Sequence, residues 1–184
     1  MRSIVYLLWL SFLCGQPVVA GEAPGYASIT PESAFKMVEA DPERIHLVDV
    51  RTQPEYQLVG HPARACNIPL MFWSGKFDGK TYAEAPNPGF TKAVFARFDP
   101  ARDTLVFFCR SGGRSAKACA ACIAAGWPAD RVLNLEGGFE GEKVKDKGSP
   151  YFGQRRVNGW RNAGLPWTYD IDRRLIYSGD SAGS

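Results

Sequence analysis

Short, largely apolar runs recur along the chain, and turn residues or segments of helical character separate them. These runs are 26–29, 45–50, 65–68, 104–108 and 131–135. Short apolar runs bounded by Gly, Pro or Asp are typical of buried strands. Because such runs alternate with helical segments, the pattern predicts a parallel α/β sheet covered by helices on both faces.

The intervening segments carry helix signals. Thr30 directly before Pro31 is typical of a helix start, since threonine caps the helix and proline suits its first position. The alanine content of 116–125 favours a helix, which Gly126 and Pro128 would end. The expected helices are 31–39, 54–58, 91–98 and 116–125.

The loop between the strand 104–108 and the helix that follows it carries the most informative residues. These are Cys109, Arg110, Ser111, Gly112, Gly113, Arg114 and Ser115. A cysteine between a strand end and a helix start faces unpaired N–H groups and the positive end of the helix dipole, which lower a thiol pKa. The two glycines let several amides point at one centre, and the two arginines add positive charge. We therefore expect Cys109 to be a thiolate nucleophile in an anion-holding loop.

Ligands of parallel α/β sheets bind beyond the carboxyl ends of the strands. The Cys109 loop, the turn after Asp49 and the turn at Gly137-Gly138 are expected at that edge. Two inserted segments, 71–90 and 141–158, are expected there as well; the first is rich in aromatic residues and the second in lysine and arginine. They are either surface loops or a partly apolar, partly cationic rim over the active loop.

Length and composition limit the range of functions. A chain of 184 residues with 45% hydrophobic and 22% charged residues suits one globular domain with insertions. A net charge of +3 is too small to indicate nucleic-acid binding, and basic residues do not alternate with aromatic ones as single-strand binding requires. Two histidines without clustered carboxylates or thiols predict no metal site.

The first twenty residues have the pattern of a cleaved export signal. Arg2 gives a positive start, residues 4–14 are apolar, and Val18-Val19-Ala20 ends in small residues that a signal peptidase accepts. The apolar stretch is too short to span a bilayer, so no membrane anchor is expected after cleavage. We expect a mature protein that begins near Gly21 in the periplasm, or in an equivalent space outside the cell.

The motifs together resemble those of single-domain rhodaneses over about 29–167. The residues that carry the resemblance are 47–51 with 55–56, 60–61 and 67–69, the loop 109–115, and 135–138 with 159–160 and 163–166. The insertion 141–158 splits the closing signature, and 62–66 departs from the family's usual Ile-Pro-Gly-Ala stretch. The resemblance implies a rhodanese-like domain over 26–168, after a signal peptide at 1–20 and before a C-terminal tail at 169–184.

The resemblance also implies a sulfurtransferase that needs no cofactor. Cys109 would attack the outer sulfur of an anionic donor such as thiosulfate, release sulfite and hold a persulfide for a thiol or protein acceptor. Loop amides from Arg110 to Ser115 would stabilise the anionic sulfur. Arg114, together with Arg110, would orient the donor's sulfonate. Structural pairs beneath the loop are expected from Asp49, Arg51 and Glu55.

Three alternatives bear on the same residues. Dual-specificity cell-cycle phosphatases resemble rhodaneses in fold but carry a Cys-x5-Arg loop. Here four residues separate Cys109 from Arg114, and this shorter loop suits sulfur.

A thiol redox protein would use Cys119 and Cys122, which share a helix face but lie in a helix interior. Core packing or a disulfide among these two and Cys66 stays open. A persulfide carrier without turnover of its own needs the same loop and stays open too.

Overall fold

The computed structural model describes residues 25–178, so the export signal expected at 1–20 lies outside the described residues. Within that range the main sheet has five strands, all parallel, in the order β1-β7-β6-β2-β3. The strands are β1 (Ala27–Ile29), β2 (Ile45–Asp49), β3 (Cys66–Asn67), β6 (Thr104–Phe108) and β7 (Val132–Leu135). This sheet confirms the parallel α/β fold predicted from the apolar runs.

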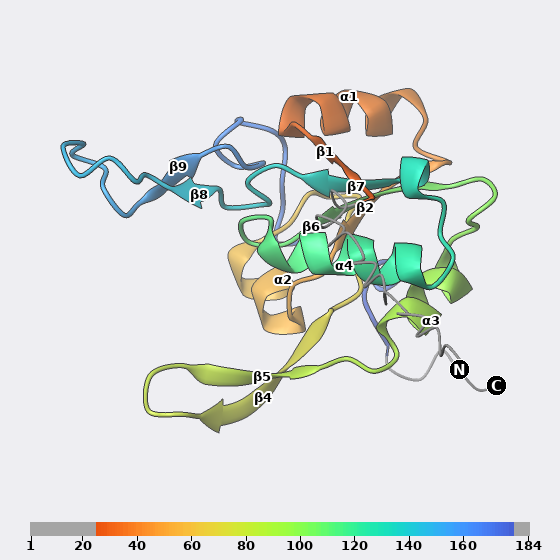
Figure 1. Cartoon of the computed structure of the whole chain (residues 1–184), viewed down its shortest axis with the longest axis horizontal. Helices are drawn as coiled ribbons and strands as arrows, with labels where there is room; N and C mark the ends of the chain where they lie inside the picture. Colours follow the sequence, from red (N-terminus) through yellow and green to blue (C-terminus); the bar gives the residue numbers. More distant parts are fainter. Residues whose placement is uncertain (1–24, 179–184) are drawn as a thin grey trace, which may run out of the picture.

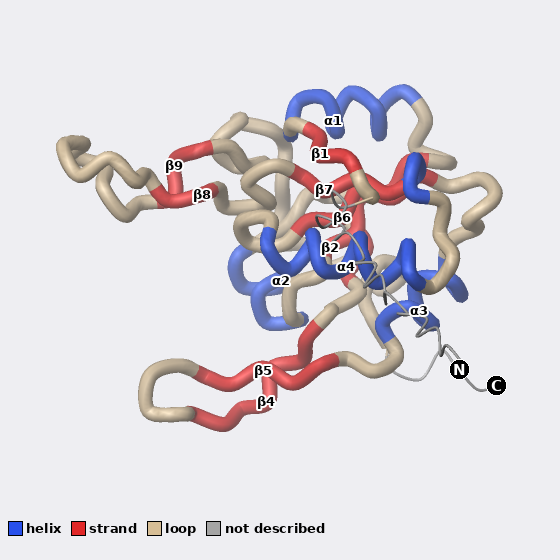
Figure 2. The backbone as a smooth tube through the Cα atoms, viewed as in Figure 1, coloured by secondary structure: helices blue, strands red, loops and turns tan. Residues whose placement is uncertain are grey.

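Helices cover both faces of the sheet (Figures 1 and 2). They are α1 (Pro31–Ala40), α2 (Gln53–Val59), α3 (Phe90–Arg97) and α4 (Gly113–Ala124), with a short 3-10 turn at Ala129–Arg131. Helices α3 and α4 share a core with Val48 and Phe107, whereas α1 and α2 share one with Leu47 and Val106. Successive strand side chains point to opposite faces, so each buried strand supplies two cores. No helix within 25–178 is long and apolar enough to cross a membrane.

The parallel strands bring three chain segments to one edge of the sheet. Strand β2 ends at Asp49, which pairs in register with Phe108 at the end of β6, and β7 ends beside them at Leu135. Cys109 therefore leaves the sheet at its carboxyl edge, next to the turn after β2 and the turn after β7. Helix α4 begins at Gly113, three residues before the predicted start, because the glycine loop itself turns into the helix.

The segment 71–90, expected as a loop, instead holds an antiparallel hairpin of β4 (Met71–Phe77) and β5 (Tyr82–Pro86). Aromatic residues favour strands, and the Asp78 side chain accepts hydrogen bonds from the amides of Lys80 and Thr81, which closes the turn. The hairpin projects from the sheet at the end where α4 begins (Figure 1).

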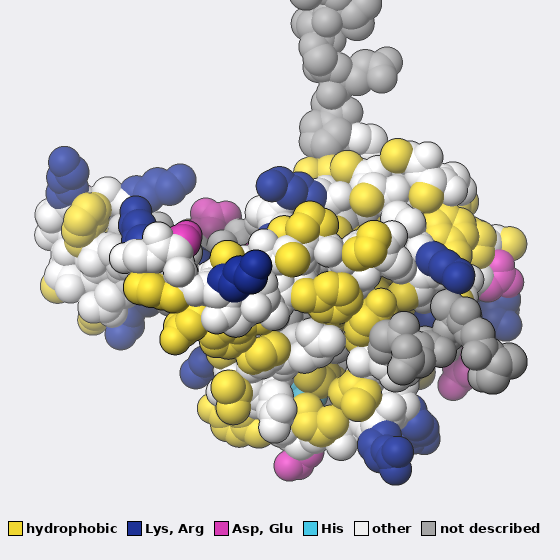
Figure 3. Space-filling view, turned by 90° about the horizontal axis from the view of Figure 1, so that it is seen from below, with side chains coloured by type: hydrophobic (Ala, Val, Ile, Leu, Met, Phe, Trp, Pro, Cys, Tyr) yellow, Lys and Arg dark blue, Asp and Glu magenta, His cyan; other side chains and the backbone are white. Residues whose placement is uncertain are grey.

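The insertion 141–158 forms a second, irregular hairpin of β8 (Glu142–Lys143) and β9 (Arg155–Val157). It projects away from the sheet on the same side of the molecule as the first hairpin (Figure 1). Lysine and arginine side chains gather on this projecting segment in the space-filling view (Figure 3). Its base is anchored by Arg155, which donates a hydrogen bond of 2.8 Å to the Gly141 carbonyl.

The expected C-terminal tail packs on the domain as far as it is described. The amide of Asn67 donates to the Leu175 carbonyl at 2.8 Å. The Tyr177 ring lies 5.8 Å from that of Phe72, between ring centres, and both Ile176 and Tyr177 pack against the apolar cores. Residues 169–178 therefore stabilise the edge strand β3 and the root of the first hairpin.

Candidate functional site

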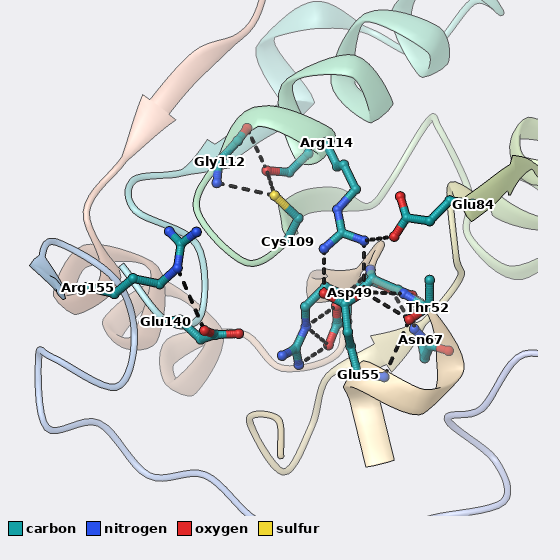
Figure 4. A network of polar contacts seen from close by, with 12 residues as sticks. Asp49, Thr52, Glu55, Asn67, Glu84, Cys109, Gly112, Arg114, Glu140 and Arg155 are labelled. Atoms are coloured by element: carbon teal, nitrogen blue, oxygen red, sulfur yellow. Dashed lines mark hydrogen bonds and ion pairs between the residues drawn. The ribbon is translucent and has the colours of Figure 1, made fainter. Parts of the chain in front are cut away.

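Cys109 lies at the centre of a ring of loop donors. It follows β6 directly, and its side chain is almost fully buried among apolar residues. Its Sγ accepts a hydrogen bond from the Gly112 amide at 3.2 Å, and the Ser115 hydroxyl lies 3.5 Å from the same sulfur (Figure 4). Gly112 has a φ of 101°, a left-handed conformation that suits glycine and turns its amide toward the sulfur.

These contacts favour the thiolate form of Cys109. Burial by itself raises the pKa of the thiol, because it disfavours the charged form. The Ser115 hydroxyl, the amides of Ser115 and Ser111 and the positive charge of Arg114 outweigh that effect, and the pKa of Cys109 lies below its ordinary value. A thiolate held in this way is the reactive form of cysteine.

The turn after β7 supports the active loop from beneath. Gly138 has a φ of 58°, and a Cβ added there would lie 2.3 Å from the Cys109 carbonyl oxygen and 2.8 Å from the Ser111 amide. The amide of Phe139 donates to the Cys109 carbonyl at 2.8 Å, and the amide of Glu140 donates to the Arg110 carbonyl at 3.0 Å. Only glycine allows this close approach of two backbones.

Arg114 is bound by two carboxylates of the protein. Its Nη2 lies 2.6 Å from Oε1 of Glu55, and its Nη1 lies 2.8 Å from Oε2 of the same residue. Nη1 also donates to Oε1 of Glu84, on β5 of the first hairpin, at 3.1 Å (Figure 4). Arg114, expected to orient an anionic donor, is thus held by acidic side chains on α2 and β5.

Glu55 has a second role at the start of α2. Its side chain accepts hydrogen bonds from the amide and the hydroxyl of Thr52, while the Thr52 hydroxyl accepts one from the Glu55 amide. This capping box fixes the carboxylate in front of Arg114. Burial raises the pKa of Glu55, but the hydrogen bonds and charge of Arg114 outweigh it and lower that pKa to about 2.

Asp49 and Arg51 form a separate, fully buried pair behind the loop. Arg51 Nη2 lies 2.6 Å from Asp49 Oδ2 and also donates to the Gly60 carbonyl at 2.7 Å. The guanidinium carbon lies 4.5 Å from the centre of the Phe139 ring. Neither charged side chain reaches solvent, so this pair fixes the turn after β2 to the segment after β7. Asp49 and Arg51 thus lie in a buried pair behind the loop, whereas Glu55 pairs with Arg114 and lines the cleft instead of lying beneath the loop.

A cleft of about 690 Å³ opens over the active loop. The active loop and the start of α4 form one wall, and the first hairpin forms the other. The lining residues are Glu55, Asp78, Thr81, Tyr82, Ala83, Glu84, Cys109, Arg110, Ser111, Gly113, Arg114 and Lys117. The segment 71–90 therefore does border the site, as the rim hypothesis expects. No residue of 141–158 lines this cleft.

The other cysteines of the described chain lie in the core. Cys66, Cys119 and Cys122 are buried free thiols. Burial raises the pKa of Cys66 and of Cys122 to about 12 each, and it raises that of Cys119 as well. Their thiols are therefore protonated, unlike that of Cys109, which favours core packing over a redox role.

Among the charged residues that line the cleft, neither Glu84 nor Lys117 was singled out from the sequence. Nothing in the sequence around Glu84 connects it with Arg114, because the contact depends on how the hairpin folds back. Lys117 had a usable signal, since it lies four residues after Gly113 and three after Arg114, a spacing that places all three on one helix face.

Comparison with known proteins adds independent information. A sequence model described as "Rhodanese-like domain" matches residues 30–144. Thiosulfate sulfurtransferase 18 of Arabidopsis thaliana is 37% identical over 94 residues, which cover 50% of this chain and 62% of that protein. Senescence-associated protein DIN1 of Raphanus sativus is 31% identical over 125 residues, 62% of each chain. The chain thus spans less than two thirds of the length of these two plant relatives.

A solved structure agrees with these sequence matches. The crystal structure of Rv0390 from M. tuberculosis is similar with a TM-score of 0.56 and 30% identity, over 79% of this chain and 99% of that one. The match takes in nearly the whole of that chain, so the likeness is to a whole domain.

Proposed function

Because the chain belongs to the rhodanese-like domain family, we propose that it is a sulfurtransferase that carries sulfane sulfur on Cys109. Relatives named thiosulfate sulfurtransferases support this type of function at the level of the family. The observation that carries the proposal is the Cys109 sulfur, which accepts a hydrogen bond from the Gly112 amide and faces the Ser115 hydroxyl at the floor of the cleft.

In the proposed reaction, the Cys109 thiolate attacks the outer sulfur of thiosulfate. A bond forms between Sγ and that sulfur, the S–S bond of thiosulfate breaks, and its electron pair leaves with sulfite. An acceptor thiolate then attacks the outer sulfur of the persulfide, and the electron pair of the broken bond returns to Sγ. The loop amides and the Ser115 hydroxyl stabilise the negative sulfur before and after each transfer. No step needs a cofactor, a metal or a histidine base.

We further propose that the reaction takes place outside the cytoplasm. The proposal rests on the charge and apolar pattern of residues 1–20. N-terminal sequencing of the protein from the periplasm of a bacterial host is expected to find a chain that begins near Gly21. Recovery of the uncleaved chain from the cytoplasm contradicts it.

Mass spectrometry after thiosulfate treatment tests the sulfur-transfer step. The protein is expected to gain one sulfur atom on Cys109, and Cys109→Ser is expected to gain none. Cys119→Ser is the matched control, because it removes a buried, protonated thiol of α4 and leaves the loop intact. Cyanide is then added to the persulfide form; thiocyanate released over repeated cycles indicates an enzyme, and loading without turnover indicates a persulfide carrier.

A further inference from the structure

The charge of Arg114 is already compensated inside the cleft. Glu55 binds both of its terminal nitrogens, and Glu84 binds Nη1 as well. Arg114, Glu55 and Glu84 together carry a net charge of −1. A thiolate on Cys109 adds one more negative charge. An anionic donor that met only these groups would be repelled from the nucleophile that must attack it.

Two cationic side chains of the cleft are not compensated in this way. Arg110 and Lys117 both line the cleft and are exposed. Among the contacts of residues 25–178, neither side chain makes a hydrogen bond or an ion pair with the protein. The remaining acidic group on the cleft wall is Asp78, whose Oδ1 accepts hydrogen bonds from two amides of its own turn.

In the sequence, Arg110 precedes the first residue of α4 and Lys117 follows it. Arg110 directly follows the nucleophile. Lys117 lies one helical turn beyond Gly113 on the cleft face of α4, whereas Ser115 and Ala118 are buried against the sheet. Both cations therefore border the same cleft as the Cys109 sulfur.

We propose that Arg110 and Lys117 bind the anionic end of the sulfur donor, and that Lys117 is a specificity-determining residue for donors with an oxyanion leaving group. Arg114 is then a positioning residue that Glu55 and Glu84 hold in place. As the S–S bond of the donor breaks, negative charge builds up on the departing sulfite, and the two cations stabilise it. This inference rests on the proposed function for the identity of the donor, but not for the existence of the anion subsite.

Two alkylating agents that differ in charge test the subsite without sulfur transfer. Iodoacetate is an anion and iodoacetamide is neutral, and both alkylate the thiolate of Cys109. In Lys117→Gln, the iodoacetate rate is expected to fall by about three- to tenfold, as expected for a partly screened charged contact, while the iodoacetamide rate stays the same. Arg110→Gln is also expected to lower the iodoacetate rate, and the double variant is expected to lower it more than either single variant.

Lys36→Gln is the matched control, since it removes one exposed lysine from α1, on the opposite face of the sheet. An equal ratio of the two rates in Lys117→Gln and Lys36→Gln overturns the role of Lys117. The thiosulfate concentration that gives half-maximal loading is expected to rise in Lys117→Gln and not in the control. If the alkylation ratio falls in Lys117→Gln but the wild-type protein takes no sulfur from thiosulfate, the subsite stands and the proposed function fails.

Discussion

Glu55 and Arg114 lie 59 residues apart in the sequence and form a two-pronged ion pair at the mouth of the active loop, with N–O distances of 2.6 and 2.8 Å. Glu55 is fixed in the capping box of α2, and Arg114 is in the first turn of α4. The pair therefore links two helices that pack on opposite faces of the sheet. It also holds a positive charge near Cys109, where that charge helps to lower the pKa of the thiol.

The ion pair is expected to make stability depend on pH in the acid range. The folded-state pKa of Glu55 is about 2, below its ordinary value of 4.5, so its contribution is complete above that ordinary value. It is lost as the pH falls from 4.5 toward 2, because the unfolded chain takes up the proton more readily.

Urea unfolding of the wild type and of Glu55→Gln at several pH values measures this contribution. The difference in the free energy of unfolding is expected to shrink as the pH falls through that window. Glu32→Gln, an exposed acidic residue in the first turn of α1, is the control. A difference that stays constant down to the lowest pH would contradict the prediction.

Ser115→Ala is expected to raise the pKa of the Cys109 thiol. The Ser115 hydroxyl is among the groups that lower this pKa, and a methyl group cannot donate a hydrogen bond to the sulfur. The pH dependence of alkylation by iodoacetamide reports the thiolate, and its midpoint is expected to move to higher pH. Ser111→Ala is the control, because the hydroxyl of Ser111 makes no hydrogen bond to Sγ. An identical midpoint in both variants would show that the backbone amides suffice.

Gly138→Ala is expected to destabilise the protein by more than about 2 kcal/mol and to abolish sulfur loading. The added Cβ would overlap the Cys109 carbonyl, so the active loop has to move. Gly164→Ala is the matched control: its φ of 68° carries a similar left-handed strain, but nothing lies within 4 Å of its Cβ. Thermal unfolding and mass spectrometry after thiosulfate measure the two effects. Equal losses of stability and of sulfur loading in both variants would contradict the role of close packing at Gly138.

Much of the fold could be predicted from the sequence, because buried parallel strands have short, continuous apolar sequences. The strand β6 was predicted at its observed bounds, and Cys109 was placed at the carboxyl edge of the sheet. The start of α4 was predicted too late, since glycine is a poor helix former and the helix signal lay in the later alanines. The hairpin β4–β5 was missed because long aromatic stretches among Gly and Pro also occur in irregular loops.

The charge balance of the cleft could not be predicted in the same way. Sequence alone placed two arginines in the active loop, but it could not show which of them a carboxylate already neutralises. That depends on Glu55, which the α2 capping box orients, and on Glu84, which a hairpin brings across from a distant part of the chain. Long-range ion pairs leave no local pattern, whereas strands and caps do.

The basic hairpin β8–β9 is expected to speed the arrival of anionic donors without contacting them. Its lysines and arginines do not line the cleft, but the hairpin projects on the side of the molecule where α4 begins (Figure 1). Basic side chains gather on this projecting segment (Figure 3). Surface charges act over about 8–10 Å at ordinary ionic strength, so they steer approach rather than hold a bound ion.

Shortening 141–158 to a tight turn is therefore expected to slow loading by thiosulfate at low salt and to flatten its salt dependence. Cyanide consumption from preformed persulfide is expected to change less, because the sulfur is then already bound. A triple variant that replaces Lys143, Lys145 and Lys147 with glutamine keeps the length of the hairpin and is expected to reproduce the effect. If only the shortened protein loses the salt dependence of thiosulfate loading, the effect comes from the shape of the hairpin. Wild-type loading rates in both variants would exclude steering by this segment.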